Sequence, residues 1–178
     1  MNISERLLLE FDREMAKARK LLECAPEERF DWHPPGQVMK LRCLVSSMAD
    51  LPTRITAALD QSSLNVTRVD SSGSAATLAP SSGTRYLEIF ASNVHEARDR
   101  IVEASDERLL ARLTFELNGK AILSMPREAV IRHVVLGRLR WQRALLAMYL
   151  QIARVAIDPS RDKTQGCNSV RSSECHQA

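Results

Sequence analysis

The chain has 178 residues, of which 44% are hydrophobic and 26% are charged, and its 25 basic and 22 acidic residues leave a net charge of +3. A chain of this length buries roughly 70% of its unfolded surface, so a single domain needs no disulfide or metal to hold its core. The basic residues are interleaved with acidic ones and form no stripe with aromatic residues. We therefore expect no nucleic-acid partner.

The first half of the chain predicts two amphipathic helices. Apolar residues recur at helical spacing over residues 3–23. Acidic residues stand among them, so we expect neither a signal peptide nor a membrane span there. A loop containing Pro-Pro-Gly follows, and a second helix is expected over residues 39–59, with Pro52 kinking it or ending it locally.

The middle of the chain predicts a loop, a helix and a hairpin. Residues 61–83 are rich in serine and other small residues, which favours a long loop. A third helix is expected over residues 85–103, and a short helical turn opens at residue 105 and continues to residue 113. The segment TFELNGKAILSM alternates weakly around Asn118 and Gly119, which predicts a short β-hairpin.

The last long helix is expected to begin with Pro126 at its first position and to run to about Arg154. The chain after Ile157 has almost no apolar residue, so residues 158–178 are predicted to be a disordered tail and residues 1–157 to be the domain. The fold class that follows is all-α: a four-helix bundle with a short β-hairpin-like excursion before the last long helix.

The cysteines favour a reduced protein. None of the four lies in a CxxC pair, and two of them lie in the polar tail. We therefore expect a cytoplasmic protein and no zinc site built from these thiols. They are Cys24, Cys43, Cys167 and Cys175.

Two polar residues are out of place on the last helix. At about 100° per residue, a narrow apolar face forms along it. Arg138 and Gln142 lie in the middle of that face, one helical turn apart. The apolar residues of the face are Ile131, Val135, Leu139, Leu146, Tyr149 and Ala153.

Three stretches, in order, resemble the DinB/YfiT-like family of four-helix bundles, whose members are often described as metal-dependent hydrolases or thiol transferases. The resemblance spans roughly residues 5–160. The stretches are LLLEFDREMAKARKLLE, PEERFDWHPPGQVMKLRCLVSSMADLP and LSMPREAVIRHVVLGRLRWQRALLAMYLQ.

The resemblance implies a divalent metal held by three histidines, one from the second helix and two, four residues apart, from the last. Laid over this sequence, the three positions are Ser47, Arg138 and Gln142. An arginine has no lone pair and stays protonated, so it repels a cation. We therefore expect no metal and no cofactor. A site rebuilt from other residues would have to use His33, His95 or Cys43, which their spacing disfavours.

The same three positions are the candidate site. Arg138, Gln142 and Ser47 are the candidate catalytic residues. Arg138 could hold an anionic group through its planar guanidinium, with Gln142 and Ser47 as neutral contacts. Alternatively, an internal salt bridge fills the site, with a partner for Arg138 among Asp50, Glu10 and Asp12, and with Ser47 a small packing residue. The candidate substrate-binding residues, each of which could instead serve packing alone, are Cys43, Tyr149, Trp141 and Trp32.

Three functions remain open on the sequence. The first is a metal-independent protein that binds, and transforms if it is an enzyme, a small anionic or carbonyl-bearing molecule in a specialised biosynthetic pathway. The second is a pseudoenzyme, a binding or dimerisation module whose site is plugged by an ion pair. The third is the metal-dependent thiol S-transferase or hydrolase activity that the resemblance implies. We expect no membrane partner, and because such bundles often pair through helix faces, a homodimer stays open.

Overall fold

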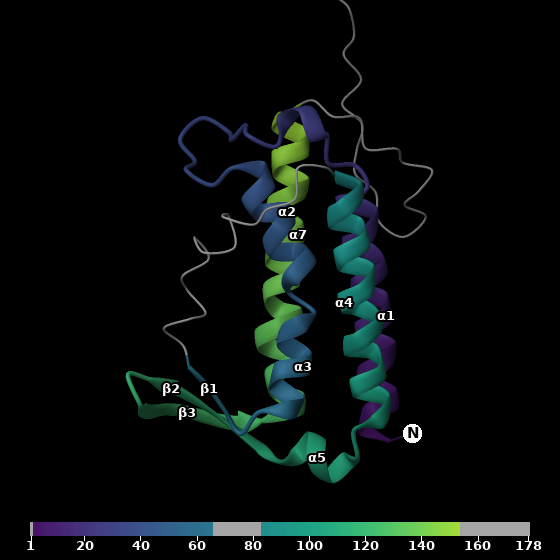
Figure 1. Ribbon diagram of the computed structural model, residues 1–178, viewed down its shortest axis with the longest axis vertical. Coiled ribbons are helices and arrows are strands. Elements are labelled where there is room, and N and C mark those ends of the chain that lie inside the picture. Colours follow the sequence, from purple (N-terminus) through teal and green to yellow (C-terminus); the bar gives the residue numbers. More distant parts are fainter. Residues whose placement is uncertain (1, 66–82, 154–178) are drawn as a thin grey trace, which may run out of the picture.

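The computed structural model describes residues 2–65 and 83–153. This part of the chain is mostly helical, with a small three-stranded sheet at one end (Figure 1). The predicted tail, residues 158–178, and most of the predicted loop lie outside the described residues. No helix in the described ranges is long and apolar enough to cross a membrane. The longer helices are α1 (Ile3–Leu22), α2 (Leu41–Asp50), α3 (Thr53–Asp60), α4 (Gly83–Glu103) and α7 (Gly137–Ile152).

Helix α1 begins where its capping residues lie. The Asn2 side chain accepts a hydrogen bond from the backbone N–H of Glu5, and the Glu5 carboxylate accepts one from the backbone N–H of Asn2. This reciprocal pair satisfies two of the donors that a helix leaves free at its start. The prediction of a helix over residues 3–23 is confirmed.

The second predicted helix is broken at Pro52, as expected. Helix α2 ends at Asp50 and α3 starts at Thr53, with Pro52 at the N-cap of α3. Proline has no backbone N–H and clashes with the preceding turn, so one continuous α-helix cannot pass through it. The two short helices nevertheless follow one another along the same side of the molecule (Figure 1).

The hairpin is confirmed, and a third strand was missed. Strands β2 (Arg112–Leu117) and β3 (Lys120–Pro126) pair antiparallel around Asn118 and Gly119, both of which have a positive φ as a tight two-residue turn requires. Strand β1 (Ser63–Asn65) pairs parallel to β2. It lies in the stretch expected to be a loop, where three residues are too few for an alternating pattern to show. An all-α class therefore omits a real, if small, sheet.

The helix before the sheet is shorter than expected. Helix α5 (Asp106–Leu110) begins at the Ser105 cap and ends before β2, so residue 113 belongs to the strand rather than to the helical turn. Pairing with β3 gives the backbone of this segment a complete set of hydrogen bonds, so the segment forms a strand instead of a further helical turn.

The last helical segment is not one regular α-helix. Pro126 ends β3 and caps α6 (Arg127–Ala129), and a π-helix, η4 (Val130–Leu136), then leads into α7. A π-helix is held by hydrogen bonds between residues five apart. The buried residues of η4 follow that spacing and are Val130, Ile131, Val135 and Leu136. The prediction assumed a regular α-helix with 100° per residue and so did not include this change of pitch.

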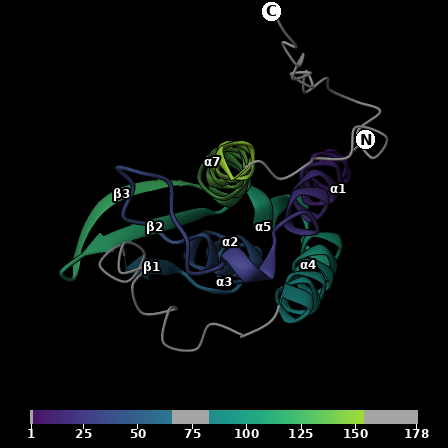
Figure 2. The ribbon, with the colours of Figure 1, turned by 90° about the horizontal axis from the view of Figure 1, so that it is seen from above.

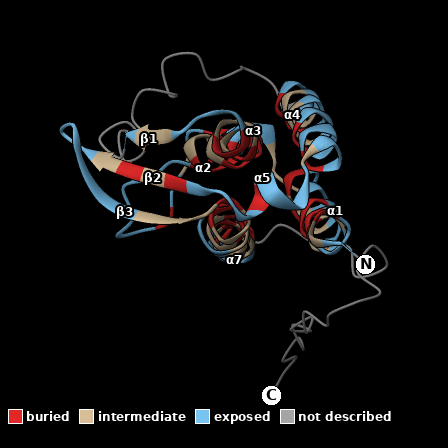
Figure 3. Cartoon of the chain, turned by 90° about the horizontal axis from the view of Figure 1, so that it is seen from below, coloured by how far each residue is buried: buried red, intermediate tan, exposed pale blue. Residues whose placement is uncertain are grey.

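The core lies between the long helices. Helix α1 packs against α4 and α7, and α2 packs against the same two helices (Figure 2). In Figure 3 the buried residues of the helices face the middle of this arrangement, whereas the sheet extends to one side, beside α3 and α7. A smaller apolar cluster joins the sheet to the helices and contains Ala58, Leu113, Phe115 and Val130.

Candidate functional site

Two of the three candidate positions meet in the structure. The Gln142 side-chain amide, on α7, donates a hydrogen bond from Nε2 to Oγ of Ser47, on α2, at 2.6 Å. Gln142 is only 2% exposed. The polar residues that interrupt the apolar face of the last helix therefore lie at the seam between α2 and α7.

The third position, Arg138, adds a guanidinium N–H that has no hydrogen-bond partner. Arg138 precedes Gln142 by four residues on α7, which places both on the same side of the helix. Its side chain is half-buried, and its Nε is fully covered without a hydrogen-bond partner. The Gln142 Oε1 is likewise buried without a partner. Such atoms are rare because each one loses the hydrogen bonds that water would offer.

The internal salt bridge considered for Arg138 is not formed. Within the described part of the chain no carboxylate pairs with Arg138. Two of the three candidate partners bind other arginines: Glu10 pairs with Arg132 and Arg140, and Asp12 pairs with Arg98. The third, Asp50, has its pKa raised by burial, which the positive charge of Arg54 partly offsets.

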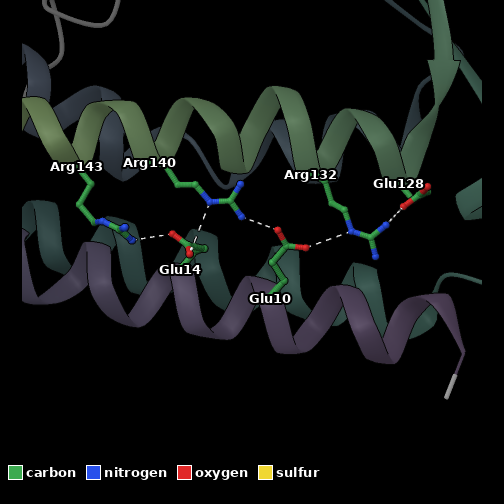
Figure 4. A network of polar contacts seen from close by, with 6 residues as sticks. All are labelled: Glu10, Glu14, Glu128, Arg132, Arg140 and Arg143. Atoms are coloured by element: carbon green, nitrogen blue, oxygen red, sulfur yellow. Dashed lines mark hydrogen bonds and ion pairs between the residues drawn. The ribbon is translucent and has the colours of Figure 1, made fainter. Parts of the chain in front are cut away.

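The acidic residues of α1 belong to a separate network that was not predicted from the sequence (Figure 4). Glu14 accepts hydrogen bonds or ion pairs from Arg143 at 2.7 Å and from Arg140 at 3.6 Å, and its side chain is only 9% exposed. Glu10 lies one turn earlier and bridges Arg140 and Arg132, which also contacts Glu128. Arg132, Arg140 and Arg143 thus all bind acidic residues of α1.

A signal for this network was present in the sequence. Glu10 and Glu14 are four residues apart, and each lies three residues after a buried residue of α1, Leu7 and Phe11, on the same side of the helix. Carboxylates so close to the apolar stripe need a cation from the neighbouring helix. The network occupies the seam between α1 and α7, whereas Gln142 faces α2.

Three of the predicted substrate-binding residues lie near the seam. Cys43 is half-buried one turn before Ser47 on α2. Tyr149, on α7, is 1% exposed, donates its hydroxyl to the carbonyl of Met39 at 2.9 Å, and packs edge-on against Trp32 with ring centroids 6.1 Å apart. Burial raises the pKa of Tyr149, and the neighbouring Cys43 raises it further. The hydroxyl of Tyr149 is therefore already occupied by the chain.

The fourth residue, Trp141, was expected to pack beside the apolar face and does not. Its side chain is 56% exposed. Trp141 directly precedes Gln142, and successive residues of an α-helix point about 100° apart. Burial of Gln142 in the seam therefore turns Trp141 outwards, so Trp141 does not pack in the core.

Two further buried polar residues were not singled out as unusual by their sequence. Tyr86, on α4, is 1% exposed with an unpartnered hydroxyl, and burial raises its pKa. Arg127 is 4% exposed and donates from Nη1 to the carbonyl of Ala58 at the end of α3, at 3.0 Å. Burial lowers the pKa of Arg127, and the charge of Arg108 lowers it further.

The residues at the seam do not fit a divalent metal. Ser47 and Gln142 offer only neutral oxygen ligands, and Arg138 places a permanent positive charge beside them. No group of three or more His, Cys, Asp or Glu side chains within residues 2–65 and 83–153 could hold a metal ion. His133 and His95 are exposed, and His95 lies 3.5 Å from Asp99 on the surface.

The seam therefore contains a small polar centre in which the Nε–H of Arg138 lacks an acceptor and the Oε1 of Gln142 lacks a donor. No family model matches the chain, and no curated protein matches it either.

Proposed function

We propose that the chain is a metal-independent, DinB-like four-helix protein that uses Arg138, Gln142 and Ser47 to bind a small organic molecule bearing a carboxylate or carbonyl group. The single observation that carries the proposal is that Nε of Arg138 and Oε1 of Gln142, on residues four apart along α7, are both buried without a hydrogen-bond partner. An anionic ligand would supply the acceptor that the guanidinium lacks. The same proposal includes membership of the DinB/YfiT-like family, a cytoplasmic location and a role in a biosynthetic pathway.

The lack of an internal partner supports a binding role over a plugged site. A plugged site needs a carboxylate on Arg138, and the candidates Glu10 and Asp12 are engaged elsewhere. A guanidinium N–H that is covered without an acceptor is costly to maintain. A ligand that accepts a hydrogen bond from this N–H would remove the penalty on binding. The positive charge of Arg138 would also stabilise an enolate or oxyanion if the ligand reacts.

A thermal-shift screen tests the proposal. The wild-type protein is heated with small carboxylates, ketones, zinc and nickel, beside Arg138→Met and the control Arg98→Met. Arg98 pairs with Asp12 on the surface and is remote from the seam in sequence, so its loss removes the same charge without touching the site. A ligand at 100 times its Kd stabilises the native state by about 2.7 kcal/mol, and a chain of this size gains roughly 2–4 °C per kcal/mol.

We expect a carboxylate or ketone to raise the melting temperature of the wild-type protein and of Arg98→Met, but not that of Arg138→Met. Stabilisation by zinc or nickel alone would overturn the metal-independent proposal. An equal shift in Arg138→Met would show that the ligand binds elsewhere. No shift with any compound, together with early unfolding of Arg138→Met, would favour a structural role for Arg138.

A further inference from the structure

We infer that the ligand at the seam is a small hydroxycarboxylate, whose carboxylate binds Arg138 and whose hydroxyl donates to Gln142. This inference rests on the proposed function and names the chemical class within it. The inference follows from Gln142 Oε1, the second buried atom without a partner. This oxygen requires a hydrogen-bond donor, whereas the Nε–H of Arg138 requires an acceptor.

The orientation of the Gln142 amide sets the requirement. Its Nε2 donates to Ser47 Oγ at 2.6 Å, which leaves Oε1 as the free end of the amide. A carbonyl oxygen accepts hydrogen bonds and cannot donate them. A ligand that carries only a carboxylate or only a ketone therefore leaves Oε1 unmatched, and an additional carboxylate oxygen would repel it.

The neighbouring charge decides which donor fits. A ligand could present a hydroxyl, an amide N–H or an ammonium group to Oε1. An ammonium would lie close to the Arg138 guanidinium, where like charges repel in surroundings of low dielectric constant. A neutral amide would offer Arg138 a single carbonyl oxygen, whereas a carboxylate balances the charge of the guanidinium and can accept two parallel N–H bonds from it. A hydroxyl beside a carboxylate matches both atoms.

The spacing on α7 limits the size of the ligand. Residues four apart on a helix have Cβ atoms about 5–6 Å from each other. An acid of three or four carbons with its hydroxyl on the second or third carbon spans this interval.

Titration calorimetry with matched acids tests the inference. The probes are 3-hydroxybutyrate, butyrate and acetoacetate, which share a four-carbon skeleton and differ only at the third carbon. They are titrated into the wild-type protein, Gln142→Met and Arg138→Met. Methionine keeps the length of each side chain without its polar atoms, and the comparison of probes in the wild-type protein needs no variant to fold.

We expect 3-hydroxybutyrate to bind the wild-type protein roughly tenfold or more tightly than butyrate or acetoacetate, because an unmatched buried acceptor costs about that much affinity. Gln142→Met should bring the three affinities together, and Arg138→Met should abolish all three. Equal affinities in the wild-type protein, still lost in Arg138→Met, would overturn the hydroxyl requirement and leave the proposed function standing. Absence of binding by all three would overturn the hydroxycarboxylate, and the wider screen would then decide the proposed function.

Discussion

Gln142 on α7 and Ser47 on α2 form a 2.6 Å hydrogen bond in the interior, between positions 95 residues apart in the chain. The bond ties the last long helix to the second one. It also satisfies only one end of a buried amide, since Oε1 has no partner. The two residues therefore stabilise the seam between the helices less than a complete network would.

Ser47→Ala is expected to destabilise the protein by about 1–3 kcal/mol, because both ends of the Gln142 amide are then buried without a partner. The double variant Ser47→Ala/Gln142→Leu should recover most of that loss, since it removes the polar atoms on both sides. Urea unfolding of the two single variants and the double variant measures the coupling. Additive losses in the double variant would show that the two side chains do not interact.

Glu14 should matter more to stability than the acidic residues of exposed ion pairs. Its side chain is 9% exposed and faces Arg143 and Arg140, so Glu14→Gln leaves Arg143 without its carboxylate and Arg140 with Glu10 alone. We expect a loss of about 1.5–3 kcal/mol in the free energy of unfolding.

The matched control for Glu14 is Asp12→Asn. Asp12 lies two residues earlier on α1 and pairs with Arg98, with both side chains 46% exposed. Exposed pairs contribute about 0–1 kcal/mol. Denaturant unfolding at low and high salt compares the two variants. Equal losses, both reduced by salt, would mean that Glu14 behaves as an ordinary surface charge.

The two buried tyrosines should respond differently to loss of their hydroxyls. Tyr149→Phe leaves the Met39 carbonyl without its donor, for an expected cost of about 0.5–1.5 kcal/mol. Tyr86→Phe removes a hydroxyl that has no partner, so the free energy of unfolding should stay the same or rise. Thermal unfolding of both variants at neutral pH distinguishes them, and a larger loss in Tyr86→Phe would contradict the assignment.

The same tyrosines predict the response to alkali. Burial raises the pKa of both hydroxyls above the ordinary value of 10.0. The folded protein then keeps phenolic protons that the unfolded chain releases, so this contribution to stability is fully present below that pH and is lost as the pH rises through the raised pKa values. Unfolding measured from pH 8 to 11 should show the decrease, and Tyr86→Phe should make it shallower. An unchanged slope in that variant would contradict a raised pKa at Tyr86.

The sequence predicted the elements whose signals are local. The Pro52 break, the capped start of α1 and the Asn118-Gly119 turn each depend on a few adjacent residues. The parallel strand β1 depends instead on pairing with a segment about 50 residues away, and the π-helix η4 depends on a pitch that a regular helical periodicity does not represent.

The residues of the candidate site could likewise be predicted in part from the sequence. Gln142 and Arg138 stood out because they interrupt an apolar face, and Ser47 was identified through the resemblance. Which carboxylate each arginine binds could not be deduced, because Glu10 and Glu14 had several arginines within reach. Their choice depends on how α1 lies against α7, which only the packed structure determines.

The most direct test of an anion site at Arg138 is to observe its Nε–H group itself. Proton–nitrogen correlation spectra of arginine-labelled protein resolve such groups, and Arg138→Lys identifies the signal by its absence. During a titration with butyrate, we predict that the Arg138 Nε–H shows the largest shift while the Arg98 signal stays in place. A saturating titration that leaves the Arg138 signal unmoved would contradict the account.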